Sequence, residues 1–200
     1  FGRGEWVGAL RGGVVLAKEA GARIVPDPSV VGSTQDMVAA MGGVAIQAKT
    51  GHAFIKQTMR AHGAVYGGEM SAHHYFRDFA FCDSGMIPWL LVAELVSHSG
   101  RSLADWVSGR FGAFPSSGEI NFRVEDAGLA IERVLDAHRG DAVSIDETDG
   151  VSLAFADWRF NLRRSNTEPL VRLNVEGGGG AEGLSYKVSK ISNLLGGTVA

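Results

Sequence analysis

The order of predicted helices and strands changes near the middle of the chain, and this change constrains the fold more than any other feature. In the first half, strands and helices alternate, which is typical of an α/β domain with a mixed, largely parallel sheet and helices on both faces. The second half has several strands in succession, which favours a smaller α+β domain with an antiparallel sheet. We place the first domain at residues 1–112 and the second at 118–200, joined by a linker around Pro115, Ser116 and Ser117.

Apolar periodicity and glycine stops locate the individual elements. The first half is expected to contain helices at Trp6–Ala20, from Ser33 to Met41, at Ala53–Ala61 and at Ile87–Val96, and strands at Ala22–Val25, Val44–Ala48 and Ala64–Tyr66. The second half is expected to contain strands at 119–124, 142–145, 151–156, 159–163 and 170–175, and helices at 127–135 and 184–195. Asp149-Gly150 lies between two of these strands and is typical of a tight hairpin.

Composition excludes several classes of protein. The 200 residues carry a net charge of −3 without clustered basic residues, so nucleic acid is not an expected partner. Cys82 is the single cysteine, which excludes an intrachain disulfide and a cysteine-based zinc site and favours the cytoplasm. The longest apolar run, Met86–Val96, is too short for a membrane helix. The chain does not begin with methionine, and we expect it to be a piece of a longer protein.

The first segment with candidate chemistry is Lys49-Thr-Gly-His-Ala-Phe-Ile-Lys56. Thr50 and Gly51 are predicted at a strand–helix junction, where unpaired backbone N–H groups and the helix dipole attract anions. Lys49 and His52 add further donors. A plain capped turn with a solvated lysine is the alternative, and this segment taken alone favours it.

The second segment is Gly67-Gly-Glu-Met-Ser-Ala-His-His-Tyr-Phe76. Glu69 and Ser71 are suited to hydrogen bonds with adjacent sugar hydroxyls. His73 and His74 are adjacent, and strand neighbours point to opposite faces, so the two are not expected to bind one metal ion. We interpret His74 as a structural residue. For His73 a functional role and a structural role are equally good interpretations.

The third segment is Arg163-Arg-Ser-Asn-Thr-Glu-Pro169, in a predicted loop between strands. Arg163, Ser165, Asn166 and Thr167 bring a guanidinium, two hydroxyls and an amide close together, a set suited to a phosphate dianion. A hydrophilic hairpin tip explains the same residues equally well. The sequence contains neither a P-loop motif nor an Asp-rich run typical of a magnesium site, so no metal ligands are assigned.

Together, the segments KTGHAFIK, GGEMSAHHYFRDFAFCDSGMIPWLLVAEL, FPSSGEINFRV and DWRFNLRRSNTEPLVRLNVE resemble the C-terminal half of the α-D-phosphohexomutases, and most of all the bacterial phosphomannomutases. The resemblance covers about Asp27 to Glu176, and GEMS and RxSNT are its most specific motifs. It implies that the chain holds the third and fourth of four domains.

The resemblance also implies an activity and a site. Members of this family interconvert hexose 6-phosphates and 1-phosphates, here those of mannose, by intramolecular phosphoryl transfer through a hexose bisphosphate. The sugar would be bound by Glu69 and Ser71, with Thr50, Gly51, His52 and His73 lining the same cleft. The non-reacting phosphate would be bound by Arg163, Ser165, Asn166 and Thr167. His73 is the candidate catalytic residue.

Two departures from the family pattern limit this expectation. The phosphoserine loop and the Mg²⁺-binding loop of the family belong to its first two domains and have no counterpart here, so this chain is expected to be inactive without the missing N-terminal domains. Where relatives commonly have a basic residue after an early strand, this chain has Ser29, which leaves the acid–base assignment to His73. Phosphoglucomutase activity and a non-catalytic phosphosugar-binding module are the alternatives.

Overall fold

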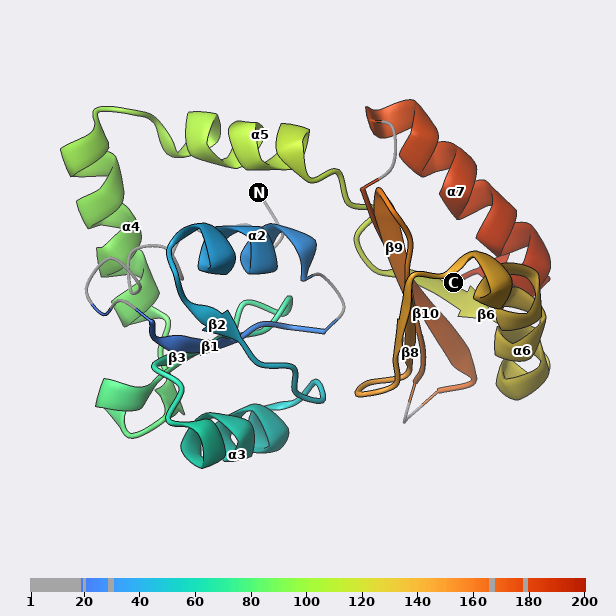
Figure 1. The fold of residues 1–200 in the computed structure, drawn as a ribbon, viewed down its shortest axis with the longest axis horizontal. Helices are drawn as coiled ribbons and strands as arrows, with labels where there is room; N and C mark the ends of the chain where they lie inside the picture. The colour runs from blue at the N-terminus through green and yellow to red at the C-terminus, as the bar shows by residue number, and fades with distance from the viewer. Residues whose placement is uncertain (1–18, 20, 29–30, 166–167, 178–179) are drawn as a thin grey trace. The chain divides into compact units, whose positions relative to one another are not determined.

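The computed structural model describes residues 19, 21–28, 31–165, 168–177 and 180–200 (Figure 1). The helix expected at Trp6–Ala20 therefore lies outside the described residues, apart from Glu19. The contacts between residues divide the chain into two units, Phe1–Ala113 and Phe114–Ala200, and each unit has its own sheet.

The first unit contains a mixed five-stranded sheet, as the sequence predicts. In spatial order its strands are β2 (Val44–Ala45), β1 (Arg23–Val25), β3 (Tyr66–Gly68), β4 (His74–Phe76) and β5 (Cys82–Asp83). Strands β2, β1 and β3 are parallel, whereas β4 and β5 are antiparallel to their neighbours. The sequence did not indicate β4 and β5, because strands of two or three residues are too short to show a period.

Helices cover both faces of this sheet (Figure 1). The helices of this unit are α2 (Gly32–Ala40), α3 (His52–His62), α4 (Met86–Ser99) and α5 (Leu103–Ala113), with a 3₁₀ turn, η1, at Arg77–Phe79; α2 and α3 lie on opposite faces of the sheet. Side chains alternate between the faces: Ile24 and Tyr66 belong to the core that includes Val38 of α2, whereas Val25 and Tyr75 belong to the core that includes α3. Helix α2 begins one residue before the expected Ser33, and α5 was not expected.

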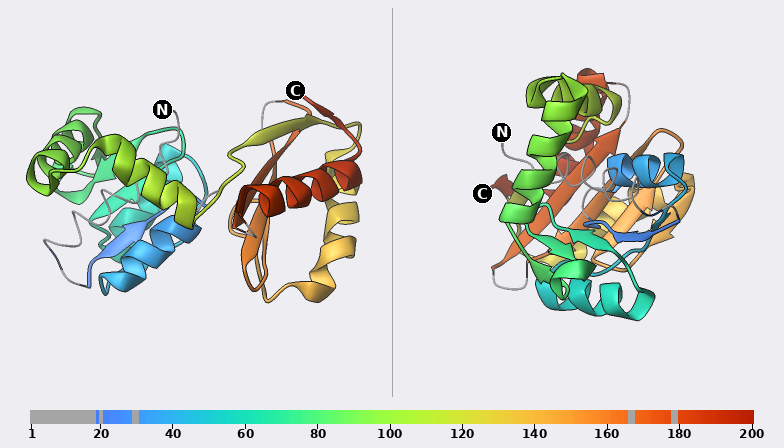
Figure 2. Two further views of the ribbon diagram at one scale, coloured as in Figure 1. Left: turned by 90° about the horizontal axis from the view of Figure 1, so that it is seen from above. Right: turned by 90° about the vertical axis from the view of Figure 1, so that its left-hand side faces the viewer.

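The second unit is built on a six-stranded antiparallel sheet, which confirms the predicted α+β class. In spatial order its strands are β11 (Thr198–Val199), β6 (Ile120–Arg123), β10 (Leu170–Gly177), β9 (Trp158–Arg164), β8 (Val151–Ala154) and β7 (Ser144–Asp146). Helices α6 (Ala127–His138) and α7 (Gly180–Leu195) lie on one face of this sheet (Figures 1 and 2). A short 3₁₀ turn, η2 (Arg139–Asp141), follows α6. The main core of the unit lies between these helices and the strands.

The segment predicted as a linker, residues 115–117, directly follows the boundary between the two units and forms backbone hydrogen bonds with the end of β10. Ser116 is buried and pairs with Glu176 as an isolated bridge. The backbone N–H of Ser117 donates to the carbonyl of Val175 at 2.9 Å, and that of Gly177 donates to the carbonyl of Pro115 at 2.8 Å. Pro, Ser and Gly predicted a loop from local propensity, but the pairing partner is supplied by a strand about sixty residues further along the chain.

The predicted Asp149-Gly150 turn connects β7 and β8, which pair as an antiparallel hairpin. Gly150 has a φ of +69°, in the left-handed region. A Cβ atom at this position would lie 2.3 Å from the carbonyl oxygen of Leu162 and 2.9 Å from the Cα of Arg163. Both the conformation and the close approach of β9 therefore require glycine here.

We expect Gly150→Ala to lower the free energy of unfolding by about 2 kcal/mol, because it adds left-handed strain to a clash with backbone. Urea denaturation measures the change. Gly140→Ala is the matched control in the same unit, since a Cβ there meets no atom within 4 Å and its φ is not positive. Equal unfolding midpoints for the two variants would contradict the prediction.

Candidate functional site

A pocket of about 320 Å³ in the first unit collects most of the residues selected from the first two segments. It is lined by Gly51, His52, Lys56, Glu69, Ser71, His73, Tyr75 and Asp83. Thr50 directly precedes this set but is not one of the lining residues. The structure therefore brings together residues of segments 49–56 and 67–76, each of which the sequence selected as a candidate for binding.

The loop that carries Glu69 and Ser71 is a tight turn between β3 and β4. The backbone N–H of Glu69 donates to the carbonyl of His73 at 2.9 Å, and that of Ala72 donates to the carbonyl of Glu69 at 3.0 Å. Ala72 closes the turn with a φ of +68°, an uncommon conformation for a residue with a side chain. The buried carboxylate of Asp27 accepts a 2.8 Å hydrogen bond from the N–H of Met70. This bond fixes the turn to the segment that follows β1.

Glu69 is only 7% exposed, and its carboxylate is surrounded by hydroxyl groups. The hydroxyl of Tyr75 donates to Oε1, and that of Ser71 donates to Oε2 at 3.4 Å. The pKa of Tyr75 is raised well above its usual range, mainly because the side chain is buried. The hydrogen bond to the Glu69 carboxylate is the second cause. The pocket thus presents one carboxylate oxygen held by a buried donor and a second, more loosely held oxygen beside Ser71, an arrangement suited to sugar hydroxyls.

The two adjacent histidines have different surroundings, as the sequence predicts. His74 is buried, with Nδ1 2.6 Å from the hydroxyl of Tyr66. His73 is half-exposed, with Nδ1 3.2 Å from Oδ2 of Asp83. The imidazole of His73 lowers the pKa of the Asp83 carboxyl. Because a carboxylate accepts, Nδ1 of His73 is the donor in this pair, and Nε2 is the ring nitrogen that Asp83 does not engage.

Helix α3 contributes positive groups to the pocket. Gly51 is its N-cap and has a φ of +120°, and the first turn contains no acidic residue. The first backbone N–H groups of a helix have no intrahelical partner, so this end favours negative charge. Lys56 lies on the same helix, with Nζ 5.5 Å from the centroid of the Tyr75 ring.

Sequence reasoning missed Asp27, which binds the turn, and three residues that line the pocket: Lys56, Tyr75 and Asp83. The register of the sheet shows why the last two belong together, since Tyr75 of β4 is paired with Gly67 of β3 and with Asp83 of β5. A predicted β4 would have placed Tyr75 on the same face as His73, two residues away. No local pattern indicated Asp27 or Asp83, because each acts on a residue of another strand or loop.

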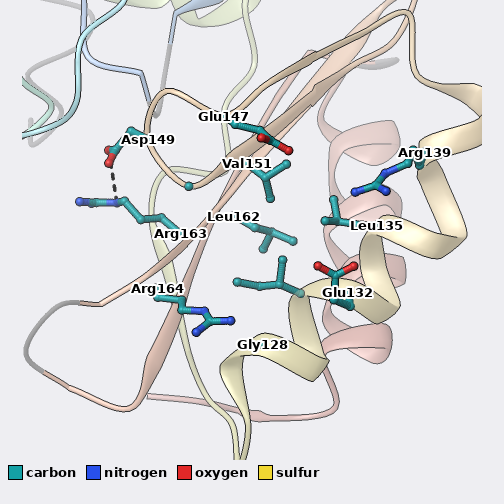
Figure 3. A pocket seen from close by; sticks show the side chains of 12 residues that line it. Gly128, Glu132, Leu135, Arg139, Glu147, Asp149, Val151, Leu162, Arg163 and Arg164 are labelled. Atoms are coloured by element: carbon teal, nitrogen blue, oxygen red, sulfur yellow. Dashed lines mark ion pairs between the residues drawn. The ribbon is translucent and has the colours of Figure 1, made fainter.

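In the second unit, the third segment, residues 163–169, begins at the C-terminal end of β9. Nη2 of Arg163 lies 3.4 Å from Oε2 of Glu119. Its Nε lies 3.7 Å from Oδ2 of Asp149, an ion pair that Figure 3 shows. The N–H of Ser165 donates to the carbonyl of Leu170 at 2.9 Å, within the β9–β10 hairpin. Asn166 and Thr167 lie outside the described residues.

Arg163 also borders a pocket of about 500 Å³ between α6 and the β8–β9 edge (Figure 3). Arg164 points from β9 toward Gly128 at the start of α6, whereas Arg163 points toward Asp149 (Figure 3). The two consecutive arginines thus lie on opposite sides of the strand, as alternation requires. The N-cap of α6 is Asp126, which accepts from the N–H groups of Gly128 and Leu129, and these bonds lower the pKa of its carboxyl.

Comparison with known proteins places this arrangement in a family. Residues 4–114 match the model of the phosphoglucomutase/phosphomannomutase alpha/beta/alpha domain III, and residues 119–188 match that of the C-terminal domain. The chain belongs to the phosphoglucomutase/phosphomannomutase family. The matches extend beyond the stretch from Asp27 to Glu176 on which the sequence motifs rest.

The relatives that match in sequence are longer proteins. A Xanthomonas campestris pv. campestris protein named for phosphohexose mutases is 57% identical over 196 residues, which is 98% of this chain and 44% of the relative. The phosphomannomutase of Salmonella montevideo is 53% identical over 195 residues, which is 98% of this chain and 43% of the relative. The chain therefore spans less than half the length of these phosphohexomutase relatives.

Solved structures show the same fold. A phosphoglucomutase/phosphomannomutase family protein from Burkholderia thailandensis aligns with a TM-score of 0.79 at 25% identity, over 99% of this chain and 43% of that one. An Aspergillus fumigatus N-acetylphosphoglucosamine mutase, solved with GlcNAc-6P and magnesium, aligns with a TM-score of 0.67 at 13% identity, over 96% of this chain and 46% of that one, a similarity of fold alone.

Within residues 19–200, leaving out the undescribed gaps, no three or more His, Cys, Asp or Glu side chains gather closely enough to hold a metal ion. In the same part of the chain, no helix combines the length and the apolar composition needed to cross a bilayer.

We expect Tyr75→Phe to cost about 1–2 kcal/mol of stability at neutral pH, because one oxygen of the buried Glu69 carboxylate loses its donor. The raised pKa of Tyr75 adds a pH dependence. Its contribution is complete below about pH 10, where the unfolded tyrosine ionises, and is lost as the pH rises further. The stability difference between wild type and variant should therefore shrink above pH 10.

Urea denaturation between pH 8 and about pH 11 measures this difference. Tyr186→Phe is the control, because the Tyr186 side chain is 61% exposed and water already reaches its hydroxyl in the folded chain. A stability difference for Tyr75→Phe that stays constant over the whole range would contradict the role of its hydroxyl.

Proposed function

We propose that this chain is the substrate-binding half of a phosphomannomutase. The complete enzyme would interconvert mannose 6-phosphate and mannose 1-phosphate by intramolecular phosphoryl transfer through a hexose bisphosphate. The observation that carries the proposal is the pocket in which Glu69, Ser71 and His73 meet the start of α3. Relatives named phosphomannomutase at 52–53% identity support the choice of sugar.

The chain would need the remaining domains of the enzyme for catalysis. The phosphoserine and the Mg²⁺ ligands would belong to the N-terminal domains, and a hexose bisphosphate would serve as intermediate and activator. When bound there, Mg²⁺ would neutralise charge that develops on the transferred phosphoryl group. We place the enzyme in the cytoplasm, where the exposed free thiol of Cys82 would stay reduced.

The first unit would recognise the sugar. The Glu69 carboxylate accepts hydrogen bonds from hydroxyl groups, and Ser71 beside it can donate or accept. Thr50, Gly51 and His52 at the start of α3 would contribute further donors. A pocket that combines acceptors and donors can bind a hexose in two orientations, because both present hydroxyls to the same groups. This property suits an enzyme that acts on both ends of one sugar.

His73 would be the general base. Asp83 orients its ring through Nδ1, so that Nε2 takes the proton from the sugar hydroxyl as the hydroxyl oxygen attacks the phosphorus atom. The P–O bond to the donor then breaks, and the proton on Nε2 is available for the reverse transfer. Asp83 would be a positioning residue, since it acts through the imidazole.

The second unit would bind the phosphate that does not react. Arg163 supplies a guanidinium suited to an oxyanion, and Ser165, Asn166 and Thr167 follow it in the connection between β9 and β10. Arg163 lies between two carboxylates at 3.4 and 3.7 Å, which are long distances for such pairs and leave the guanidinium free to change partner.

We expect mannose 1-phosphate to bind the chain with a Kd near 1 mM, which corresponds to about 4 kcal/mol and is within reach of a few charge-assisted bonds. Arg163→Ala should weaken binding about tenfold or more, because it removes the principal cation of the phosphate surface. Titration calorimetry measures both constants. Equal heats from the two proteins would exclude the assignment of the phosphate to Arg163.

A mutase assay tests the catalytic role. The chain is mixed with the missing N-terminal half and assayed in parallel with mannose and glucose phosphates, which decides between the mannose and glucose activities of the family. His73→Gln should lower kcat about 10²- to 10⁴-fold with a smaller effect on KM. His62→Gln, at the exposed end of α3, is the matched control. Turnover by the chain alone would contradict the proposal that the phosphoryl donor lies in other domains.

A further inference from the structure

Tyr75 of β4 lines the pocket of the first unit, and its hydroxyl is hydrogen-bonded to another residue of that pocket. The side chain is 1% exposed and belongs to the core that includes α3. Gly67, its partner on β3, allows this close packing, since a Cβ there would lie 2.8 Å from atoms of Ile55 and of Met59. The ring is therefore fixed in place, and its hydroxyl donates to the carboxylate of Glu69.

The two oxygens of the Glu69 carboxylate have different partners. Oε1 accepts from the buried Tyr75 hydroxyl, whereas Oε2 lies 3.4 Å from the hydroxyl of the exposed Ser71. A hydrogen bond of that length is weak, so Oε2 keeps most of its capacity to accept. Oε2 is therefore the oxygen of this carboxylate that is available to a ligand in the pocket.

Hydrogen bonds decide the orientation of this carboxylate. The terminal torsion of a glutamate side chain has a broad minimum, so the backbone of Glu69 does not determine where each oxygen points. The bond from the N–H of Met70 to Asp27 fixes the backbone of the turn but leaves that torsion free. The Tyr75 hydroxyl supplies the missing constraint, because it belongs to a ring that the core holds.

A second buried tyrosine of the same sheet offers a comparison. Tyr66 of β3 is also 1% exposed, and its hydroxyl lies 2.6 Å from Nδ1 of His74. Its ring belongs to the core on the opposite face, with α2, and neither Tyr66 nor His74 is among the residues that line the pocket. The two tyrosines thus share burial and a short hydrogen bond, but the bond of Tyr75 is made to a residue of the pocket.

We propose that Tyr75 is a positioning residue for sugar recognition. By holding Oε1 of Glu69, it presents Oε2 and the Ser71 hydroxyl to the ligand as a fixed pair, which suits two hydroxyls on neighbouring carbon atoms. A carboxylate that is already oriented loses less freedom on binding and so binds more tightly. The inference rests on the proposed function of this pocket and adds to it a residue that acts through Glu69.

Titrations of two ligands into the full chain, followed by NMR chemical shifts, test the inference. Mannose 1-phosphate carries sugar hydroxyls, and inorganic phosphate does not. Tyr75→Phe keeps the ring and should weaken the binding of mannose 1-phosphate about three- to tenfold, because a rotating carboxylate must be ordered on binding. The Kd of inorganic phosphate should stay within about twofold of wild type. A tyrosine that serves only the structure would change both constants alike, or neither.

Tyr66→Phe is the matched control, since it also removes a buried hydroxyl from this sheet. It should leave both dissociation constants within about twofold of wild type. Glu69→Ala removes the group through which Tyr75 acts. In that background, Tyr75→Phe should change the binding of mannose 1-phosphate less than twofold, and an undiminished effect would show that Tyr75 does not act through Glu69.

A measurement on the wild-type protein is independent of how well the variants fold. The hydroxyl proton of Tyr75 is shared with the Glu69 carboxylate, so its NMR resonance should shift when mannose 1-phosphate binds to the same carboxylate. Inorganic phosphate should leave it unchanged. A resonance that responds to neither ligand, at concentrations where other signals show mannose 1-phosphate bound, would overturn the inference.

The variants separate the inference from the proposed function. If Glu69→Ala weakens the binding of mannose 1-phosphate while Tyr75→Phe, folded by circular dichroism, binds like wild type, the inference fails and the proposed function stands. If Glu69→Ala has no effect either, the sugar site itself is wrong.

Discussion

The Glu69 side chain brings a negative charge into the interior of the first unit, where a carboxylate is stable only when hydrogen-bond donors surround it. Tyr75 supplies one donor from β4, and Ser71 supplies another from the turn itself. These bonds require β3 and β4 to pair as a hairpin, and Asp27 then fixes the turn through the N–H of Met70. The pocket is a consequence of this requirement, because the groups that stabilise Glu69 also line the space beside it.

Helices cover the sheets of the two units in different ways. In the first unit helices cover both faces, so polar groups gather at strand ends and in the turns beyond them. In the second unit α6 and α7 cover one face, and the opposite face carries arginine, asparagine and glutamate across several strands. The candidate site at the β3–β4 turn thus combines the Glu69 carboxylate and the Ser71 hydroxyl with the positive groups of α3, whereas the open face of the second sheet presents guanidinium groups.

The sequence predicted the longer elements well and the short ones poorly. Helices α3, α6 and α7 show an apolar period over three or more turns, and strands β9 and β10 alternate apolar and polar residues over most of their seven and eight residues. Strands β4 and β5 are too short to alternate, and residues 115–117 lack strand propensity although they form backbone hydrogen bonds with β10. The motif residues of the first pocket were found because their chemistry is local. Their partners Tyr75 and Asp83 were not, because each depends on a strand pairing.

The sequence by itself therefore determined the order of the elements, the class of each unit and the donors and acceptors carried by each loop, since these depend on residues within a few turns of one another. Only the tertiary structure decided which distant groups meet. Asp27 reaches Met70 across 43 positions, and Glu119 reaches Arg163 across 44. Such contacts follow from the spatial order of the strands, which is set by the packing of a whole sheet against its helices and leaves no periodic signal in any short stretch of sequence.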